Sequence, residues 1–204
     1  MCWDRERDKL AGQLAALKEQ GVSIAMAGTL GVAEQAMEQG FTVWGDYGLG
    51  VYNSQSLKEL KRLGFAGCTA SFELKLAQIR DLSKAVPMEL IAYGRLPLMI
   101  TENCIVYNHA GQHVCGDGLR LVDRKGARFP VVKAWGCRNE ILNAKTLFLA
   151  DKAADYARLG LWGARLMFTT ESPEDCVRIL RRYQGQRGWQ PGDYTRGLYY
   201  RDVE

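Results

Sequence analysis

Residues 22–44 set the pattern from which the fold follows: Val22-Ser-Ile-Ala-Met-Ala27, a segment expected to be helical over 30–39, then Gly40 and Phe41-Thr-Val-Trp44. The two apolar runs are short, and branched and aromatic residues in them favour extended backbone, so we expect a short buried strand over 22–27 and a second strand over 41–46. Glycine is a common end for a helix because it adopts left-handed backbone without strain. The stretch therefore predicts a strand–helix–strand unit.

The same alternation continues on both sides of this unit. Leu10, Leu14 and Leu17 lie at helical spacing between charges and predict an amphipathic helix over 4–19. Further strands are expected over 65–69, 88–93 and 161–168, and further helices over 55–63, 71–84, 144–159 and 172–183. Asn53, Ser71 and Ser172 are the expected helix caps. Strands alternating with helices and joined by glycine are typical of an α/β fold with a parallel sheet.

The number of strands limits the architecture. Five strands are expected, whereas a (β/α)₈ barrel needs eight and typically about 250 residues. The sheet is therefore either open or the later part of a barrel whose first strands are missing. Residues 184–204 lack helical or strand periodicity and form a basic, aromatic tail.

Composition narrows the class of protein. The chain has 204 residues, of which 47% are hydrophobic and 25% charged, as in a soluble globular domain with one sizeable core. No apolar run approaches the ~18 residues of a membrane span, and residues 1–9 are too charged for a signal peptide. We expect a cytoplasmic protein with no membrane association. The net charge of +4 is compatible with an anionic partner such as RNA.

Residues 101–137 differ from the strand–helix pattern around them. They hold three of the six cysteines and both histidines. Within this loop, residues 119–133 alternate apolar and charged side chains on both sides of Lys125-Gly126, which predicts an inserted β-hairpin. Cys104 and Cys115 precede the hairpin and Cys137 follows it, whereas Cys176 lies near the start of the last helix.

The cysteines leave several interpretations open. Four thiolates suit an iron–sulfur cluster or a tetrahedral zinc ion, but the spacing of these four matches neither a ferredoxin nor a zinc ribbon. Each cysteine is equally compatible with a small buried apolar side chain. His109 and His113 are four residues apart, but Gly111 lies between them and indicates a turn, where solvated histidines are the commoner case.

Several strings resemble the peptidase U32 family, which is also called collagenase-like. They are Gly45-Asp-Tyr-Gly-Leu-Gly-Val-Tyr-Asn-Ser54, Ser71-Phe-Glu-Leu74, Tyr93-Gly-Arg-Leu-Pro-Leu-Met-Ile-Thr-Glu-Asn-Cys104, Asp123-Arg-Lys-Gly-Ala-Arg-Phe-Pro130, Asn143-Ala-Lys-Thr-Leu147 and Tyr194-Thr-Arg-Gly-Leu-Tyr-Tyr-Arg201. They occur in order over residues 20–201, and they are most similar to the long U32 proteins with additional domains.

The resemblance implies a TIM-like barrel, of which residues 1–183 would be the later part, with the hairpin insertion at about 104–137 and the tail at 184–204. The upstream strands would come from a longer protein or a partner chain. Studied relatives of this kind are oxygen-independent hydroxylation proteins that act on ribosomal RNA, transfer RNA or a ubiquinone precursor. Several hold a [4Fe–4S] cluster, and their ligand pattern corresponds to Cys104, Cys115, Cys137 and Cys176.

A barrel of this type also indicates where substrate would bind. The chemistry of (β/α)₈ barrels lies at the carboxyl ends of the strands. Polar side chains that follow the expected strands are therefore the substrate-binding candidates: Asp46, Asn53, Glu73, Tyr93, Arg95, Glu102, Arg138 and Asn143. Each has a simpler explanation, as a helix cap, a solvated charge or a structural ion pair.

Three functions follow from these observations. The first is an iron–sulfur enzyme or subunit that hydroxylates an RNA base or a small anionic or aromatic precursor. The second is a peptidase, although the chain has neither an HExxH nor a GxSxG motif. The third is a non-catalytic module that binds zinc or RNA, for which the basic, aromatic tail is suited.

Overall fold

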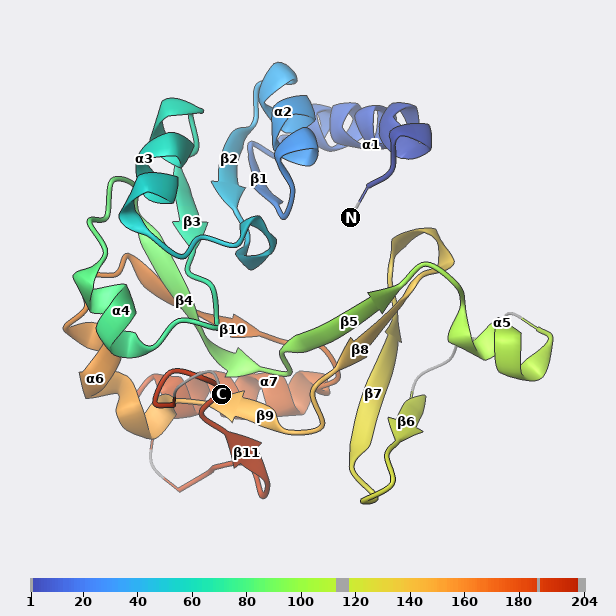
Figure 1. Ribbon diagram of the computed structural model, residues 1–204, viewed down its shortest axis with the longest axis vertical. Helices are drawn as coiled ribbons and strands as arrows, with labels where there is room; N and C mark the ends of the chain where they lie inside the picture. The colour runs from blue at the N-terminus through green and yellow to red at the C-terminus, as the bar shows by residue number, and fades with distance from the viewer. Residues whose placement is uncertain (1, 113–117, 187, 202–204) are drawn as a thin grey trace. The chain divides into compact units, whose positions relative to one another are not determined.

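The computed structural model describes residues 2–112, 118–186 and 188–201 and divides the chain into two compact units (Figure 1). Unit 1 comprises Met1–Ile91, Asp151–Arg165 and Gly197–Glu204, and unit 2 comprises Ala92–Ala150 and Leu166–Arg196. Both are built from segments far apart in the sequence, so each depends on tertiary contacts to bring its parts together.

Unit 1 is organised around a parallel sheet. Strands β1 (Ile24–Ala27), β2 (Thr42–Gly45), β3 (Gly67–Thr69) and the first part of β4 (Met88–Gly94) lie side by side in sequence order, and each neighbouring pair is parallel. Strand β10 (Gly163–Met167) also pairs with β4. The predicted α/β class with a parallel sheet is confirmed. Closure into a barrel is not seen among the described strands.

Helices connect these strands in the predicted alternation. They are η1 (Asp4–Glu6), α1 (Arg7–Glu19), α2 (Leu30–Glu38), η2 (Tyr47–Leu49), α3 (Ser54–Arg62), α4 (Leu76–Asp81), η4 (Ala150–Lys152) and α6 (Ala153–Ala157). Helix α3 shows why the sequence forms them: the Asn53 side chain accepts a hydrogen bond from the Ser56 amide at 2.9 Å, and Leu57 and Leu60 share the buried face. The Asn53 cap is thus confirmed.

Three expectations need correction. The helix expected over 71–84 is only α4, because Phe72–Lys75 form a turn in which Ser71 Oγ accepts a hydrogen bond from the Glu73 amide at 3.3 Å. The expected helix over 144–159 begins with a buried strand, β9 (Thr146–Phe148), because an apolar triplet fits either structure. Strand 22–27 was expected to be buried, but Ile24 is 61% exposed, since β1 lies at the end of the strand order.

Unit 2 contains a second, antiparallel sheet. Its order is β5 (Pro97–Thr101), β8 (Asn139–Leu142), β7 (Arg128–Lys133) and β6 (Arg120–Val122). Strands β6 and β7 form the predicted hairpin, which Asp123 closes by accepting hydrogen bonds from the amides of Lys125 and Ala127, both at 2.8 Å. Helix α5 (Ile105–Ala110) and the turn η3 (Trp135–Cys137) complete this part. His109 is exposed in the last turn of α5, which ends at Gly111 in left-handed backbone, so the break expected at this glycine is confirmed, whereas His113 lies outside the described residues.

The remainder of unit 2 packs around aromatic side chains. The end of β4 pairs antiparallel with β9, and β9 pairs parallel with β11 (Tyr194–Thr195). Helix α7 (Pro173–Tyr183) begins at the predicted cap Ser172. Phe148 is fully buried and lies edge-on to Tyr183, Trp189 and Tyr194, so the tail region is packed into this core. Gly94 has a φ of +131°, and a Cβ there would lie 2.2 Å from the Met167 carbonyl oxygen, so only glycine fits.

Candidate functional site

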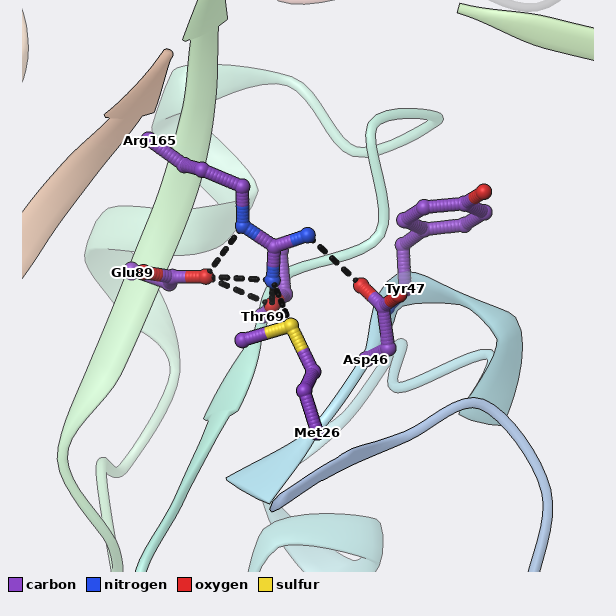
Figure 2. A network of polar contacts seen from close by, with 6 residues as sticks. All are labelled: Met26, Asp46, Tyr47, Thr69, Glu89 and Arg165. Atoms are coloured by element: carbon purple, nitrogen blue, oxygen red, sulfur yellow. Dashed lines mark hydrogen bonds and ion pairs between the residues drawn. The ribbon is translucent and has the colours of Figure 1, made fainter. Parts of the chain in front are cut away.

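Unit 1 carries a charged network on its sheet, formed by residues that are distant in sequence (Figure 2). Arg165 on β10 forms ion pairs with Asp46, directly after β2, at 2.9 Å (Nη1 to Oδ1) and with Glu89 on β4 at 2.5 Å (Nη2 to Oε1). Its Nε also donates to the same Glu89 oxygen at 2.7 Å. One guanidinium therefore joins two carboxylates from two other strands.

Two further strands contribute uncharged groups to this network. The Thr69 hydroxyl at the end of β3 donates to Glu89 Oε1 at 2.8 Å and accepts from Arg165 Nη2. Met26 Sδ on β1 also accepts from this nitrogen. Asp46 Oδ1 accepts a hydrogen bond from the Tyr47 amide at 2.8 Å and caps η2. The network thereby connects all five strands of unit 1.

The electrostatics of the network favour a permanently charged arginine. Burial lowers the pKa of Arg165, but the charges and hydrogen bonds of Asp46 and Glu89 outweigh it and raise the pKa overall. Two carboxylates against one guanidinium leave an excess of one negative charge. Asp46 Oδ2 and Glu89 Oε2 accept no hydrogen bond from the described residues. Those oxygens are suited to accept hydrogen bonds from N–H or O–H groups of a ligand.

Two other candidates in unit 1 have structural contacts. Asn53 is the cap of α3. Glu73 accepts a hydrogen bond from the Tyr52 hydroxyl, and this bond is the main reason why the pKa of Tyr52 is raised. The structure does not join either side chain to the Arg165 network.

Tyr93 and Glu171 form a polar pair in unit 2. The buried Tyr93 hydroxyl donates to Glu171 Oε1 at 3.1 Å, and Glu171 Oε2 accepts from the amides of Thr169 and Thr170 at 2.7 and 2.9 Å. Burial, followed by the negative charge of Glu171, raises the pKa of Tyr93. Tyr93 is therefore neutral at physiological pH and can donate but not act as a base.

Arg95 and Asn143 hold a bend of unit 2. Arg95 Nη1 donates to the Asn143 carbonyl oxygen at 2.9 Å and to that of Ala144, while Asn143 Oδ1 accepts from the Lys145 amide at 3.0 Å. Both candidates are thus used in backbone contacts.

The β5–β8 pair brings two of the four predicted ligands to one end of the second sheet. Thr101, the last residue of β5, is paired with Asn139, the first residue of β8. Cys104 follows β5 by three residues and Cys137 precedes β8 by two, so both lie near this end of the strand pair. The Asn139 side chain accepts a hydrogen bond from the Ile105 amide at 2.6 Å. These contacts join the two cysteine-bearing segments.

An ion pair spans the same end. Arg138, whose side chain is 3% exposed, donates from Nε to Glu102 Oε2 at 2.6 Å and from Nη1 to the Trp135 carbonyl oxygen at 3.2 Å. Both sequence candidates are thus brought together, beside Cys137. They fix the geometry of the strand end.

Of the other two predicted metal ligands, the structure describes only one. Cys176 lies on α7, and Cys115 lies outside the described residues. Among the residues that the structure does describe, no three Cys, His, Asp or Glu side chains come together in a group that could hold a metal ion. The three described cysteines, Cys104, Cys137 and Cys176, therefore do not form a metal-binding group by themselves. The four-cysteine site stays a prediction.

A groove of about 1050 Å³ lies within unit 2. Its wall includes residues of the hairpin and of the turn before α7. The charged and polar side chains that line it are Arg95, Arg120, Arg128, Lys133, Asn139, Lys145, Thr169, Thr170, Glu171, Ser172 and Asp193. Lys145 pairs with Asp193 at 3.1 Å, and Glu171 is occupied by Tyr93 and two amides. The groove is therefore cationic.

Sequence reasoning found Asp46 but missed Glu89 and Arg165. The available signal was a charged residue inside an apolar strand, which is costly unless the charge is paired. Two such residues, one acidic in 88–93 and one basic in 161–168, indicate a buried ion pair between those strands.

Comparison with models of protein families matches residues 1–119, more than half of the chain, to the family described as Peptidase family U32. Neither the curated proteins nor the solved structures gave a match. No helix among the described residues is long and apolar enough to cross a membrane. The matched region includes strands β1 to β5 and the segment Tyr93–Cys104, on which the resemblance also rested. The chain belongs to peptidase family U32.

Proposed function

We propose that this U32 protein holds a [4Fe–4S] cluster on Cys104, Cys115, Cys137 and Cys176. The proposed activity is the oxygen-independent hydroxylation of an RNA base or of a small anionic or aromatic precursor. The observation that carries the proposal is the pairing of β5 with β8, which brings the segments of Cys104 and Cys137 to the same end of a sheet. These two cysteines are 33 positions apart in sequence, so only the tertiary fold makes them neighbours in the proposed site.

The backbone at Cys137 gives independent support. Cys137 has a φ of 66°, and the preceding Gly136 has a φ of 71°. A residue other than glycine at positive φ is uncommon and costs on the order of 1 kcal/mol, and such residues concentrate at functional sites. The buried guanidinium of Arg138, paired with the half-exposed Glu102, lies directly after this residue.

Cys176, the third proposed ligand, lies one helical turn after Ser172, which lines the groove, whereas Cys115 lies outside the described residues. Binding of the cluster would have to bring Cys176 to the end of the β5–β8 pair. Four thiolates are the usual donor set for such a cluster, which would supply electron-transfer chemistry.

The side chains of the groove suit an anionic substrate. Arginine binds carboxylates and phosphates through two parallel hydrogen bonds, and Arg120 and Arg128 both line the groove. In the proposed reaction a substrate C–H bond becomes C–OH, and the oxygen comes from an oxygenated organic co-substrate R–OH, which is reduced to R–H. No molecular oxygen is consumed.

The parallel sheet of unit 1 supports a further part of the proposal. Strand β1 lies at the end of the strand order and exposes Ile24 and Met26. We propose that upstream strands, from a longer protein or a partner chain, complete a TIM-like barrel.

The test is the modification itself. RNA from cells with and without the gene is digested to nucleosides, and mass spectrometry searches for a nucleoside heavier by one oxygen atom that is lost without the gene and formed under anaerobic growth. Restoration by the wild-type gene but not by the Cys137→Ala gene is the expected result. If the nucleosides and the ubiquinone content are the same with and without the gene, the proposed activity is wrong.

A peptidase is the second candidate, favoured by the description of the matched family. Casein and gelatin assays with the wild-type protein and the Cys104→Ala variant distinguish it. Hydrolysis by the wild-type protein that is lost in the variant would support a cysteine peptidase and contradict the hydroxylation proposal. One zinc ion per chain without iron would instead favour the non-catalytic module.

A further inference from the structure

The hairpin β6–β7 carries a local excess of positive charge. Residues 120–133 carry the cations Arg120, Arg124, Lys125, Arg128 and Lys133 and the single carboxylate of Asp123. Their formal charge of +4 equals the net charge of the whole chain. The rest of the protein therefore carries no net formal charge, whereas the hairpin carries a local excess of positive charge.

These five cations have no acidic partner among the residues that the structure describes. All five are exposed. Asp123, the only acid of the hairpin, accepts two amide hydrogen bonds within its own turn instead of pairing with a cation. By contrast, Arg62, Arg80 and Arg178 on helices each pair with a nearby carboxylate. A hairpin that holds five like charges without compensation is destabilised by their repulsion, unless an anion neutralises it.

The register of the hairpin directs part of this charge into the groove. Arg120 pairs with Pro130, and Val122 pairs with Arg128, so Arg120 and Arg128 lie diagonally on the same face. Both line the groove together with Lys133 at the far end of β7. Arg124 and Lys125 extend the same charge to the exposed turn. The cations thus form a track along a two-stranded ribbon rather than one compact pocket.

A track of this kind fits a chain of regularly spaced phosphates better than a single small anion. Three of the five cations are arginines, which bind phosphate oxygens bidentately. Among the described residues that line the groove none is aromatic, so the contact is to the phosphate backbone and not to stacked bases. The groove is also lined by Gly118, three residues after Cys115, and by Asn139, two residues after Cys137. A bound strand would lie beside the segments of the proposed reactive centre.

We propose that the β6–β7 hairpin, through Arg120, Arg124, Lys125, Arg128 and Lys133, is the docking surface for the phosphate backbone of single-stranded RNA. This inference rests on the proposed function and selects RNA over the small precursor as its substrate class.

The test measures RNA affinity on the full chain, whatever its iron content. A short fluorescein-labelled oligouridylate is titrated with wild-type protein and with the Arg124→Gln/Arg128→Gln variant over about 50 to 200 mM salt. Each lost phosphate contact lowers the slope of log K against log salt by about 0.7, so the variant is expected to lose about 1.4 from the slope and on the order of tenfold in affinity at low salt. The matched control is Arg62→Gln/Arg80→Gln, which removes the same charge from paired surface arginines and is expected to bind as the wild type does.

An equal loss of affinity in both variants, or no loss in the hairpin variant, would overturn the inference. So would stronger binding to vesicles of phosphatidylserine and phosphatidylcholine than to RNA. The hydroxylation proposal fails separately: a protein that binds RNA through the hairpin but forms no hydroxylated product refutes the activity and leaves the docking surface intact.

Discussion

The Arg165 network of unit 1 and the hairpin of unit 2 use positive charge in opposite ways. Arg165 is largely buried and contacts two carboxylates, a hydroxyl and a thioether through all of its nitrogens. The hairpin holds five exposed cations without an acidic partner in the described chain. A cation that is fully paired within the fold contributes to its stability, whereas unpaired cations leave their interaction energy for a ligand. The difference predicts which substitutions change stability and which change binding.

The largest effect on stability is expected for Arg165→Ala. The substitution leaves two carboxylates facing each other, and Glu89 is 6% exposed. Breaking a fully buried pair costs about 3–5 kcal/mol, and the partial exposure of Arg165 and Asp46 reduces our expectation to about 2–3 kcal/mol. Urea denaturation followed by far-ultraviolet circular dichroism measures the loss. The control Arg62→Ala removes an exposed pair, and its unfolding curve should match that of the wild type.

A smaller loss is expected for Arg138→Ala in unit 2. The substitution removes the buried guanidinium that joins Glu102 to the Trp135 carbonyl, and we expect a loss of about 2 kcal/mol. Hydrogen exchange of the β5 and β8 amides should become faster in the variant. If exchange there is unchanged, the ion pair does not hold the strand end at Cys137.

Cys68 is expected to make the free energy of unfolding depend on pH at alkaline pH. Burial, followed by the charge of Glu89, raises the pKa of this thiol from 9.0 to about 12. The folded state therefore retains a proton that the unfolded state releases, so this contribution is complete below about pH 9 and is lost as the pH rises to about 12. Denaturation curves between pH 8 and 11 should fall more steeply for the wild type than for Cys68→Ala. Parallel curves would show that the thiol does not titrate differently in the two states.

The smallest effect on stability is expected for the hairpin. Arg124→Gln/Arg128→Gln removes exposed cations that have no described partner, so thermal unfolding should be unchanged or slightly improved. A clear destabilisation would contradict the comparison, since it would mean that these arginines are paired within the fold.

Sequence reasoning recovered the alternation of strands and helices because glycines, helix caps and short apolar runs are local signals. The hairpin was predicted for the same reason, since its turn and its alternating pattern are contiguous. The prediction of a helix was wrong at 146–148. Three apolar residues fit either a helix face or a buried strand, and only the pairing of this segment with β4 and β11 shows that it is a strand.

The candidate site was harder to predict because its contacts are not local. Asp46 was found from its position after a strand, but its partner Arg165 lies 119 residues further along the chain, and Glu89, the other carboxylate on Arg165, lies 43 residues further. The pairing of β5 with β8, which brings Cys104 and Cys137 to one strand end, is likewise a tertiary fact. A lone charge inside an apolar strand indicates that a partner is needed, but which distant residue supplies it, and in which strand register, depends on tertiary packing.

The metal content of protein purified without oxygen shows whether the four-cysteine cluster exists. Iron, sulfide and zinc are determined together with the visible absorption spectrum for the wild type, Cys176→Ala and the matched control Cys2→Ala. We expect about four iron and four sulfide per chain and a broad brown absorption in the wild type and Cys2→Ala, with most of the iron, the sulfide and the absorption lost in Cys176→Ala. A colourless wild-type protein without iron, or a spectrum unchanged by Cys176→Ala, would contradict the proposed cluster.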